Sequence, residues 1–191
     1  MEAKLDARIK RSRQLLREAL VSLIAEKGYE RLTVRDITER ATVNRSTFYK
    51  HYRDKEDLLR QTGREVFEQL VGCFEGHEQT FQEEDSRQTL VRMFEHFAQH
   101  CDFYRVMLSE QGFPHFQFYL EKVMRSALSK FKDILLPQGE REVPFDFFLH
   151  YVSAAYTGMV AWWLRNDMKY STKYMATQLM SLMRSTAQAL R

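Results

Sequence analysis

The sequence predicts an all-α protein with a short N-terminal helix-turn-helix domain followed by a larger helical domain. Three observations predict this fold class. The 191 residues are 44% hydrophobic and 29% charged, which is typical of a folded globular protein. The seven Gly and three Pro leave few positions where helices are broken. Apolar residues recur at spacings of three and four, and no run alternates apolar with polar residues as a β-strand would.

The first two helices are predicted from an apolar stripe and from a cap. Over 8–27, Leu16, Leu20 and Ile24 lie on one face of a helix, and Gly28 ends it. A short second helix follows Thr33, which is a suitable N-cap with an acidic residue three positions later. Both helices therefore bring an apolar face to a common core.

The third helix is the most informative element of the chain. Residues 42–44 predict the turn before it, and Asn44 is placed to cap the helix. Phe48 and Tyr52 lie four residues apart and face inward, which leaves polar and basic side chains outside. A short helix that is held by its apolar face and offers hydrogen-bond donors suits the major groove of DNA.

Residues 33–58 resemble the DNA-binding domain of the TetR-type (tetracycline-repressor-like) bacterial transcription regulators. The family pattern is matched by Thr33, Ile37, Ala41, Val43, Thr47, Tyr49, His51, Tyr52, Lys55 and Leu58. Thr42 stands where the family has Gly, Asn44 where it has Ser, and Ser46 where it has Gly. A threonine in a left-handed turn is strained, so the turn is expected to differ slightly. The resemblance is strong over residues 8–60 and only architectural beyond them.

The outward face of the third helix predicts a DNA-binding site. Base-edge contacts are expected from Asn44, Arg45, Ser46 and Lys50. The resemblance implies phosphate contacts from Thr33, Thr47, Tyr49, His51 and Lys55. Residues 1–60 carry 15 Lys and Arg against 10 Asp and Glu, while 14 and 16 remain for the rest of the chain. This basic N-terminal third fits a polyanion-binding region on a nearly neutral body.

A long helix over 55–76, capped by Asp54, is predicted to connect the two domains. The expected domains are residues 1–54, which bind DNA, and 55–191, which bind an effector and dimerise. Further helices are predicted at about 86–100, 102–109, 114–135 and 144–166, with a last one capped by Ser171 or Thr172. Polar loops are expected at 76–88 and 138–143.

The body has a surplus of aromatic and Met residues, which suits an adaptable apolar ligand pocket. Most of these side chains belong to a core in any helical protein. In the resembled family the body binds a small effector, and the expected pocket residues are Phe67, Phe94, Phe103, Tyr104, Phe116, Tyr119, Tyr156, Met159 and Trp162. Nothing in the sequence identifies the charge of the ligand.

The last two helices are predicted to form a homodimer interface. Small side chains permit close helix approach in one of them, and the other has a Met-rich stripe. The expected interface residues are Ala154, Gly158, Ala161, Met175, Leu179 and Met183. One helix that reads a short DNA half-site provides little specificity, so a two-fold dimer is expected on physical grounds as well. A purely intramolecular core is the alternative.

Other classes of protein find little support in the sequence. No catalytic motif or phosphate-binding Gly-rich loop is present, and neither a cofactor nor a metal is expected. His96 and His100, followed by Cys101, and the pair Cys73 and His77 have spacings that can bind metal, but ordinary polar positions are the better explanation of both. A helical metal-dependent enzyme is the corresponding alternative.

The chain is expected in the cytoplasm. Its two cysteines form no C-x-x-C motif, and its first 14 residues are too charged for a signal peptide. The apolar stretch 145–164 is as long as a membrane span, but Asp146 and His150 interrupt it, so no membrane partner is expected.

The sequence therefore predicts a dimeric, ligand-responsive transcriptional repressor that is not an enzyme. Its expected partners are a double-stranded DNA operator, a small apolar or aromatic effector and a second copy of itself. The alternative is a TetR-like helical protein that acts through a protein partner, as a co-activator or interaction module, without a small-molecule effector.

Overall fold

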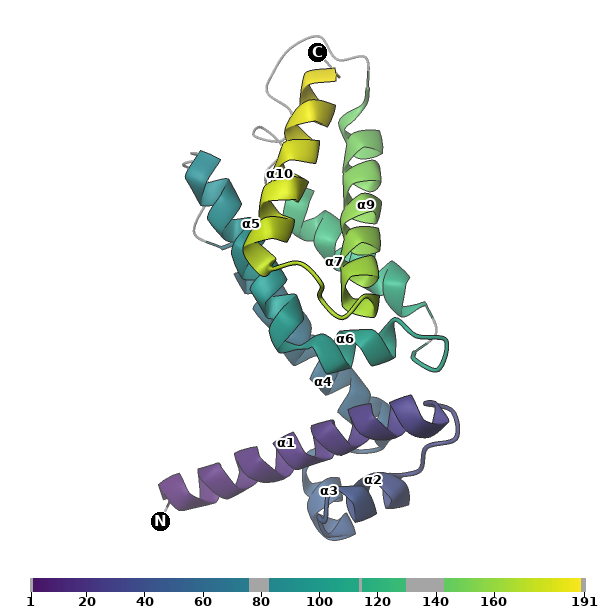
Figure 1. Cartoon of the computed structure of the whole chain (residues 1–191). Helices are drawn as coiled ribbons and strands as arrows, with labels where there is room; N and C mark the ends of the chain where they lie inside the picture. The colour runs from purple at the N-terminus through teal and green to yellow at the C-terminus, as the bar shows by residue number, and fades with distance from the viewer. Residues whose placement is uncertain (1, 76–82, 114, 130–142, 190–191) are drawn as a thin grey trace. The chain divides into compact units, whose positions relative to one another are not determined.

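The computed structural model describes residues 2–75, 83–113, 115–129 and 143–189 (Figure 1). Nine helices and no strand lie in these residues, which confirms the predicted all-α fold. The chain divides into two compact units. The first consists of Met1–Val66 with Val106–Pro114, and the second of Phe67–Arg105 with His115–Arg191. The predicted functional boundary at residues 54/55 stays a prediction, because compactness does not show which residues act together in function.

The first unit begins with α1 (Glu2–Lys27), which starts six residues before the predicted helix. α2 (Val34–Arg40) and α3 (Arg45–His51) are only seven residues long. Helices this short are not stable alone in water, so they depend on the apolar surface that they share with α1. The core that the three helices form contains Leu16, Leu20, Ile24, Ile37 and Phe48, all with 0% exposure.

The predicted N-caps and the predicted helix-ending glycine of the first unit are present. Thr33 and Asp36 form a reciprocal capping box at α2, and the Asn44 side chain accepts from the Ser46 N–H at α3. Gly28 has a φ of 79° after α1, as a helix-ending glycine requires. Thr42 also adopts a left-handed conformation, with a φ of 54°. The threonine therefore accepts the backbone strain at this position, where a glycine would avoid it.

α4 (Lys55–Gly72) begins at the predicted residue and ends four residues earlier than predicted. The Asp54 carboxylate accepts from the backbone N–H of Asp57 at 2.7 Å, so Asp54 caps the helix as expected. α4 up to Val66 belongs to the first compact unit, and its remaining residues belong to the second.

The second unit contains α5 (Glu83–Gln99), most of α6 (Cys101–Met107), α7 (Phe116–Ser129), α9 (Phe145–Arg165) and α10 (Thr172–Ala189). α5 packs mainly against α10, and α7 packs against α9. Buried aromatic residues dominate this core, namely Phe94, Phe97, Tyr104, Phe148, Tyr156 and Trp163. Ser171 caps α10 through a 3.2 Å bond from the Tyr174 N–H.

One of the two predicted loops is shorter than expected in the structure, and the other lies mostly outside the described residues. Residues 83–88 of the predicted loop 76–88 belong to α5, and residues 76–82 lie outside the described residues. Most of the predicted loop 138–143 also lies outside them. Among the described residues, no helix is both long and apolar enough to cross a membrane.

Candidate nucleic-acid interface

α3 separates its apolar and polar residues onto two faces. Phe48 is fully buried and packs against Tyr52, with 5.6 Å between the ring centroids. The four predicted base-contact residues all lie on the surface of the first unit, namely Asn44, Arg45, Ser46 and Lys50. The buried residues therefore hold the helix in place, while the four polar side chains remain available for a partner.

The N-terminal end of α3 is ordered by its own side chains. Asn44 Oδ1 accepts from both the backbone N–H and the hydroxyl of Ser46, each at 2.8 Å. The carboxamide nitrogen of Asn44 has no partner among the described residues, so it is left as a donor. Arg45 Nη2 donates to the Tyr49 hydroxyl at 3.2 Å, and its guanidinium lies 5.6 Å from the centroid of the Tyr49 ring. These contacts limit the side-chain freedom that would be lost on binding.

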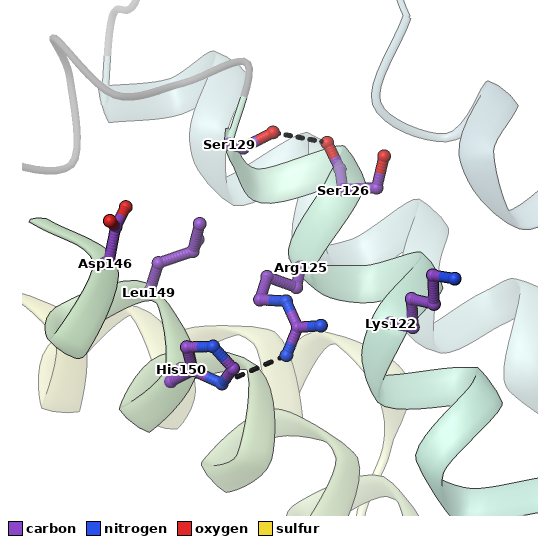
Figure 2. A pocket seen from close by; sticks show the side chains of 7 residues that line it. All are labelled: Lys122, Arg125, Ser126, Ser129, Asp146, Leu149 and His150. Atoms are coloured by element: carbon purple, nitrogen blue, oxygen red, sulfur yellow. Dashed lines mark hydrogen bonds between the residues drawn. The ribbon is translucent and has the colours of Figure 1, made fainter.

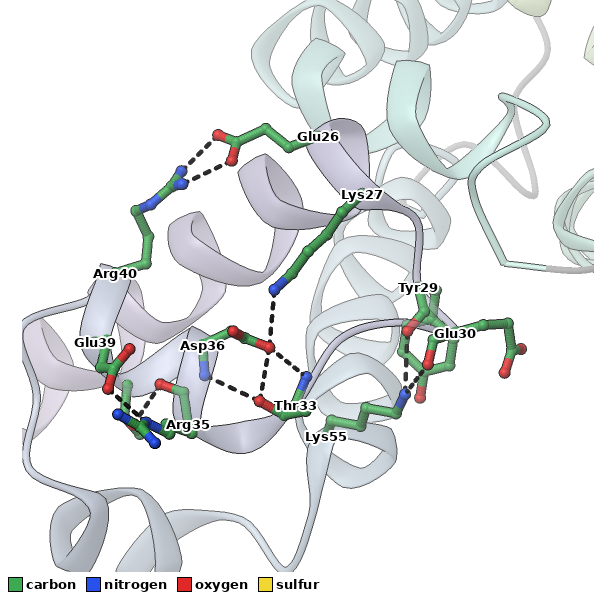
Figure 3. A network of polar contacts seen from close by, with 11 residues as sticks. Glu26, Lys27, Tyr29, Glu30, Thr33, Arg35, Asp36, Glu39, Arg40 and Lys55 are labelled. Atoms are coloured by element: carbon green, nitrogen blue, oxygen red, sulfur yellow. Dashed lines mark hydrogen bonds and ion pairs between the residues drawn. The ribbon is translucent and has the colours of Figure 1, made fainter.

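Thr33, a predicted phosphate contact, is engaged in the cap of α2 (Figure 3). Its hydroxyl donates to Asp36 Oδ2 at 2.6 Å and accepts from the Asp36 N–H at 3.2 Å. Lys27 Nζ lies 2.8 Å from the same carboxylate oxygen. The Lys27 ammonium, followed by the bonds from Thr33, holds the pKa of Asp36 well below its ordinary value. This network joins the end of α1 to the start of α2.

Lys55 is also engaged within the first unit (Figure 3). Its ammonium donates to the carbonyl oxygens of Tyr29 and Glu30 at 3.0 and 3.2 Å. The same nitrogen lies 4.6 Å from the centroid of the Tyr29 ring. Two of its three N–H bonds are thereby used to hold the segment between α1 and α2, and the third has no partner among the described residues.

The remaining predicted phosphate contacts lie on α3. Tyr49 is 49% exposed, while Thr47 and His51 are half-buried. Burial lowers the pKa of His51, and the nearby positive charges of Arg13 and Lys50 lower it further. Both effects favour the neutral form of the imidazole over the charged one.

A cluster of ion pairs between α1 and α4 was not anticipated from the sequence. Arg13 Nη2 donates to Glu65 Oε1 at 3.0 Å, and Arg17 pairs with the other oxygen of the same carboxylate. Arg13 Nε also donates to the Tyr52 hydroxyl at 3.3 Å. These partners are 39 to 52 residues apart in sequence, so no local pattern signals them.

Four of the nine predicted pocket residues converge in the second unit. Phe67 stacks on Phe116 with ring centroids 5.7 Å apart, and Phe103 meets Phe116 edge-on at the same distance. Tyr104 lies 6.3 Å from Phe116 and 5.5 Å from Phe103. The four rings pack against one another in an aromatic cluster, and the role of these residues in an effector pocket stays a prediction.

The other five predicted pocket residues do not join this cluster. Phe94 is buried against Trp163, at 5.4 Å between centroids, and the Tyr156 hydroxyl contacts Met183 Sδ. Met159 is half-buried, whereas Trp162 is 43% exposed and Tyr119 is 49% exposed. Trp162 was predicted for the pocket, but Trp163 is the buried tryptophan. Its spacing from Tyr156 and Val160 on α9 places it on their buried face.

The predicted dimer residues divide by exposure. Ala161, Met175 and Leu179 are buried within the subunit itself, so they pack in its own core. Ala154 and Gly158 are exposed on α9, and Met183 is half-buried on α10. The exposed face of α9 also carries residues that were not predicted for the interface, namely Phe147, Tyr151 and Trp162.

The histidines considered as metal ligands have other partners. His96 is buried, and its Nε2 lies 3.0 Å from the Tyr104 hydroxyl. Burial, with a smaller contribution from His100, lowers the pKa of His96 to about 4. In the part of the chain that the structure describes, no three His, Cys, Asp or Glu residues gather as a metal site would require. His77 lies outside that part.

Comparison with known families matches most of the chain. Residues 16–62 match the N-terminal model of the tetR family of bacterial regulatory proteins. Residues 84–185 match a model of the C-terminal region of TetR transcriptional regulators. An uncharacterised HTH-type transcriptional regulator of Bacillus subtilis strain 168, YxbF, is 26% identical over 187 residues. That match covers 95% of this chain and 47% of YxbF, so the chain spans about half the length of this relative.

Solved structures show the same fold. A TetR transcriptional regulator from Streptococcus agalactiae 2603V is 23% identical with a TM-score of 0.66, over 96% of this chain and 99% of that one. The fatty acid degradation regulator FadR from Bacillus halodurans is 18% identical with a TM-score of 0.68, over 90% and 94% of the two chains. FadR from Bacillus subtilis, solved in complex with stearoyl-CoA, is 18% identical with a TM-score of 0.62, over 89% and 96%.

Proposed function

Because the chain belongs to the TetR family of bacterial transcriptional regulators, which are not enzymes, we propose that it binds a DNA operator as a homodimer and represses transcription. We further propose that a small apolar or aromatic effector releases it from DNA.

The exposed polar face of α3 is the single observation that carries the DNA-binding proposal. Asn44, Arg45 and Lys50 offer donors for base edges from one accessible surface, and the Ser46 hydroxyl, which donates to Asn44, offers an acceptor. Tyr49, Thr47 and His51 flank them and are proposed to contact phosphates, with one N–H of Lys55 beside them. Thr33 is proposed to act mainly through the α2 cap, since its hydroxyl already has two bonds to Asp36.

The exposed apolar face of α9 supports the homodimer. Phe147 is 69% exposed and Tyr151 is 55% exposed, and Ala154, Gly158 and Trp162 continue the same face. Large aromatic side chains on one exposed face favour a protein–protein contact, and the small residues between them permit close helix approach. Met183 on α10 adds a partly exposed apolar contact to the proposed interface.

The aromatic cluster of Phe67, Phe103, Tyr104 and Phe116 supports an apolar effector. Such rings provide most of the contact area in pockets for apolar ligands. FadR from Bacillus subtilis, a structural relative of low identity, was solved with stearoyl-CoA, which makes long-chain acyl compounds suitable first probes. A ligand can act on DNA binding only if its affinity differs between two conformations of the protein.

Selection of bound fragments from random DNA, followed by titration of variants, tests the proposed operator binding. Lys50→Ala should weaken the selected site by about 1–3 kcal/mol and relax the base preference at one or two positions. Lys173→Ala removes an exposed positive charge from α10 and is the matched control, which should leave both properties unchanged. Failure to select any DNA sequence would refute operator binding and favour action through a protein partner.

The effector is tested by melting temperature and operator affinity in the presence of apolar compounds, with stearoyl-CoA among them. A true effector should raise the melting temperature and lower operator affinity by about 5–150-fold, which is the usual range of allosteric coupling. An effect on melting temperature without any change in operator affinity would contradict the effector role. In vitro transcription from the selected operator then shows whether the bound protein represses.

A further inference from the structure

An open pocket with a volume of about 420 Å³ lies between α7 and α9 in the second unit (Figure 2). Lys122, Arg125, Ser126 and Ser129 line it from α7, and Asp146, Leu149 and His150 line it from α9. None of the nine residues predicted for the apolar effector pocket is among them. Its volume is within the range of pockets that hold small metabolites, and all of its lining residues except Leu149 have polar or charged side chains.

Arg125 is the central side chain of this pocket. Its Nη1 donates to His150 Nδ1 at 3.0 Å and to Glu121 Oε1 at 3.3 Å. Figure 2 shows the guanidinium extending from α7 toward His150 on α9. The Nε and Nη2 groups of Arg125 have no partner among the described residues. This pair of N–H donors has the fixed spacing that matches two oxygens of a carboxylate or phosphate.

Two cations, Lys122 and Arg125, line the pocket, and two carboxylates lie near them, Asp146 in the lining and Glu121 paired with Arg125. Lys122, one turn before Arg125 on α7, has no ion-pair partner in the described part of the chain. Asp146 opposes these cations, but it lies in the first turn of α9, where a carboxylate stabilises the helix terminus. Pro144 precedes that helix without a side-chain cap. Glu121 is thus paired with Arg125 and Asp146 stabilises a helix terminus, while Lys122 and the Nε–Nη2 edge of Arg125 have no partner among the described residues.

We propose that this pocket binds the carboxylate or phosphate group of a small metabolite, with Arg125 as a two-point donor and Lys122 as the second cation. His150 Nδ1 accepts from Arg125 and thereby orients the guanidinium. The Ser126 hydroxyl is available as a further donor. The site does not depend on the apolar effector, because none of the residues proposed for that effector lines it. It would hold a second, anionic ligand between α7 and α9.

Titration of the full chain with inorganic phosphate and, separately, with acetate tests the proposal. Both titrations use sodium chloride to keep the ionic strength constant, and binding is followed by calorimetry and by the NMR shift of the Arg125 Nε–H. Saturable binding of phosphate alone identifies a phosphate-bearing ligand, and saturable binding of acetate alone identifies a carboxylate. Binding of neither anion, or a shift that never saturates, would overturn the proposal.

Three variants test the assigned residues. Arg125→Lys keeps the charge but loses the paired donors, so the bound anion should dissociate about tenfold more readily. Lys122→Gln, an exposed change that leaves α7 intact, should weaken binding severalfold. Lys173→Gln removes the same charge from α10 outside the pocket and should have no effect. Equal weakening by Lys122→Gln and Lys173→Gln would show a diffuse charge effect and refute the site.

Discussion

α3 in the first unit and α9 in the second unit both have one buried and one exposed face, but the exposed faces are of opposite character. α3 is seven residues long, is anchored by Phe48, and exposes Asn44, Arg45, Ser46 and Lys50. α9 is 21 residues long, buries ten residues, and exposes Phe147, Tyr151, Ala154, Gly158 and Trp162. The first surface suits a charged, hydrogen-bonding partner, and the second suits an apolar partner such as its own copy.

The two units are also stabilised differently. The short helices of the first unit share an apolar core with α1 and are fixed in addition by caps and polar contacts at their ends, including the Thr33–Asp36 box and the Lys55 bonds to backbone carbonyls. The second unit depends on burial of large aromatic side chains between α5, α7, α9 and α10. This difference implies that polar substitutions act mainly on the first unit, and that apolar truncations in the second unit act mainly on the body.

The largest expected effect comes from blocking the apolar face of α9. A Cβ atom at Gly158 would meet no other atom within 4 Å, so Gly158→Arg should leave the subunit folded. It should sediment as a monomer and lose specific operator binding, and affinity should fall toward the non-specific level, about 10³-fold or more weaker. Gly72→Arg, at another open glycine, is the control and should remain dimeric. A wild-type protein that sediments as a monomer at micromolar concentration would contradict the dimer.

Core truncations should separate the stability of the two units. Phe48→Ala and Phe94→Ala each remove a fully buried ring, which costs about 3–5 kcal/mol of unfolding free energy. Phe48→Ala should raise hydrogen exchange in α1–α3 and abolish DNA binding, while α5, α9 and α10 keep their protection. Phe94→Ala should instead raise hydrogen exchange in α5, α9 and α10, while α1–α3 keep their protection. Equal loss of protection across the whole chain in both variants would show that the units unfold as one.

The capping box of the first unit should make it sensitive to acid. The pKa of Asp36 is lower in the folded state than in the unfolded state, where it is about 3.9. The carboxylate therefore contributes its full share of the unfolding free energy above about pH 5. This share is lost as the pH falls from the unfolded-state pKa toward the folded-state pKa. Asp36→Asn should cost about 1 kcal/mol of unfolding free energy at pH 7. Chemical denaturation should show this difference shrinking below pH 4. A difference that is independent of pH would mean that the carboxylate charge does not contribute.

The smallest expected effects concern backbone conformation in the first unit. Thr42→Gly relieves a left-handed threonine and should raise the unfolding free energy by about 0.5–1 kcal/mol. Gly63→Ala, in the interior of α4 with no atom within 4 Å of the new Cβ, should raise it by a similar amount. Thr42→Ala is the comparison variant, because it keeps a side chain at the strained position and should gain little. Destabilisation by Thr42→Gly would show that the threonine side chain contributes contacts that outweigh the strain.

The local features of the first unit followed from the sequence. The Thr33 and Asn44 caps, the stop at Gly28 and the apolar stripe of α1 were all predicted and are all present. Each depends on residues within about four positions of one another, and helical geometry brings such residues together whatever the rest of the chain does. The expected outward face of α3 followed from the same periodicity. Its role in base contacts stays a prediction.

Only the tertiary structure decided which partners these residues find across the chain. Lys55 donates hydrogen bonds to two backbone carbonyls just after α1, 25 and 26 residues away. Arg13 donates to the Glu65 carboxylate, 52 residues away. In the body, periodicity could not tell that Met175 and Leu179 are buried within the subunit, or that Trp163 is buried while Trp162 is exposed. The position of a side chain on its own helix is local, but its burial depends on which other helix packs against that face, and this choice is made by the whole chain.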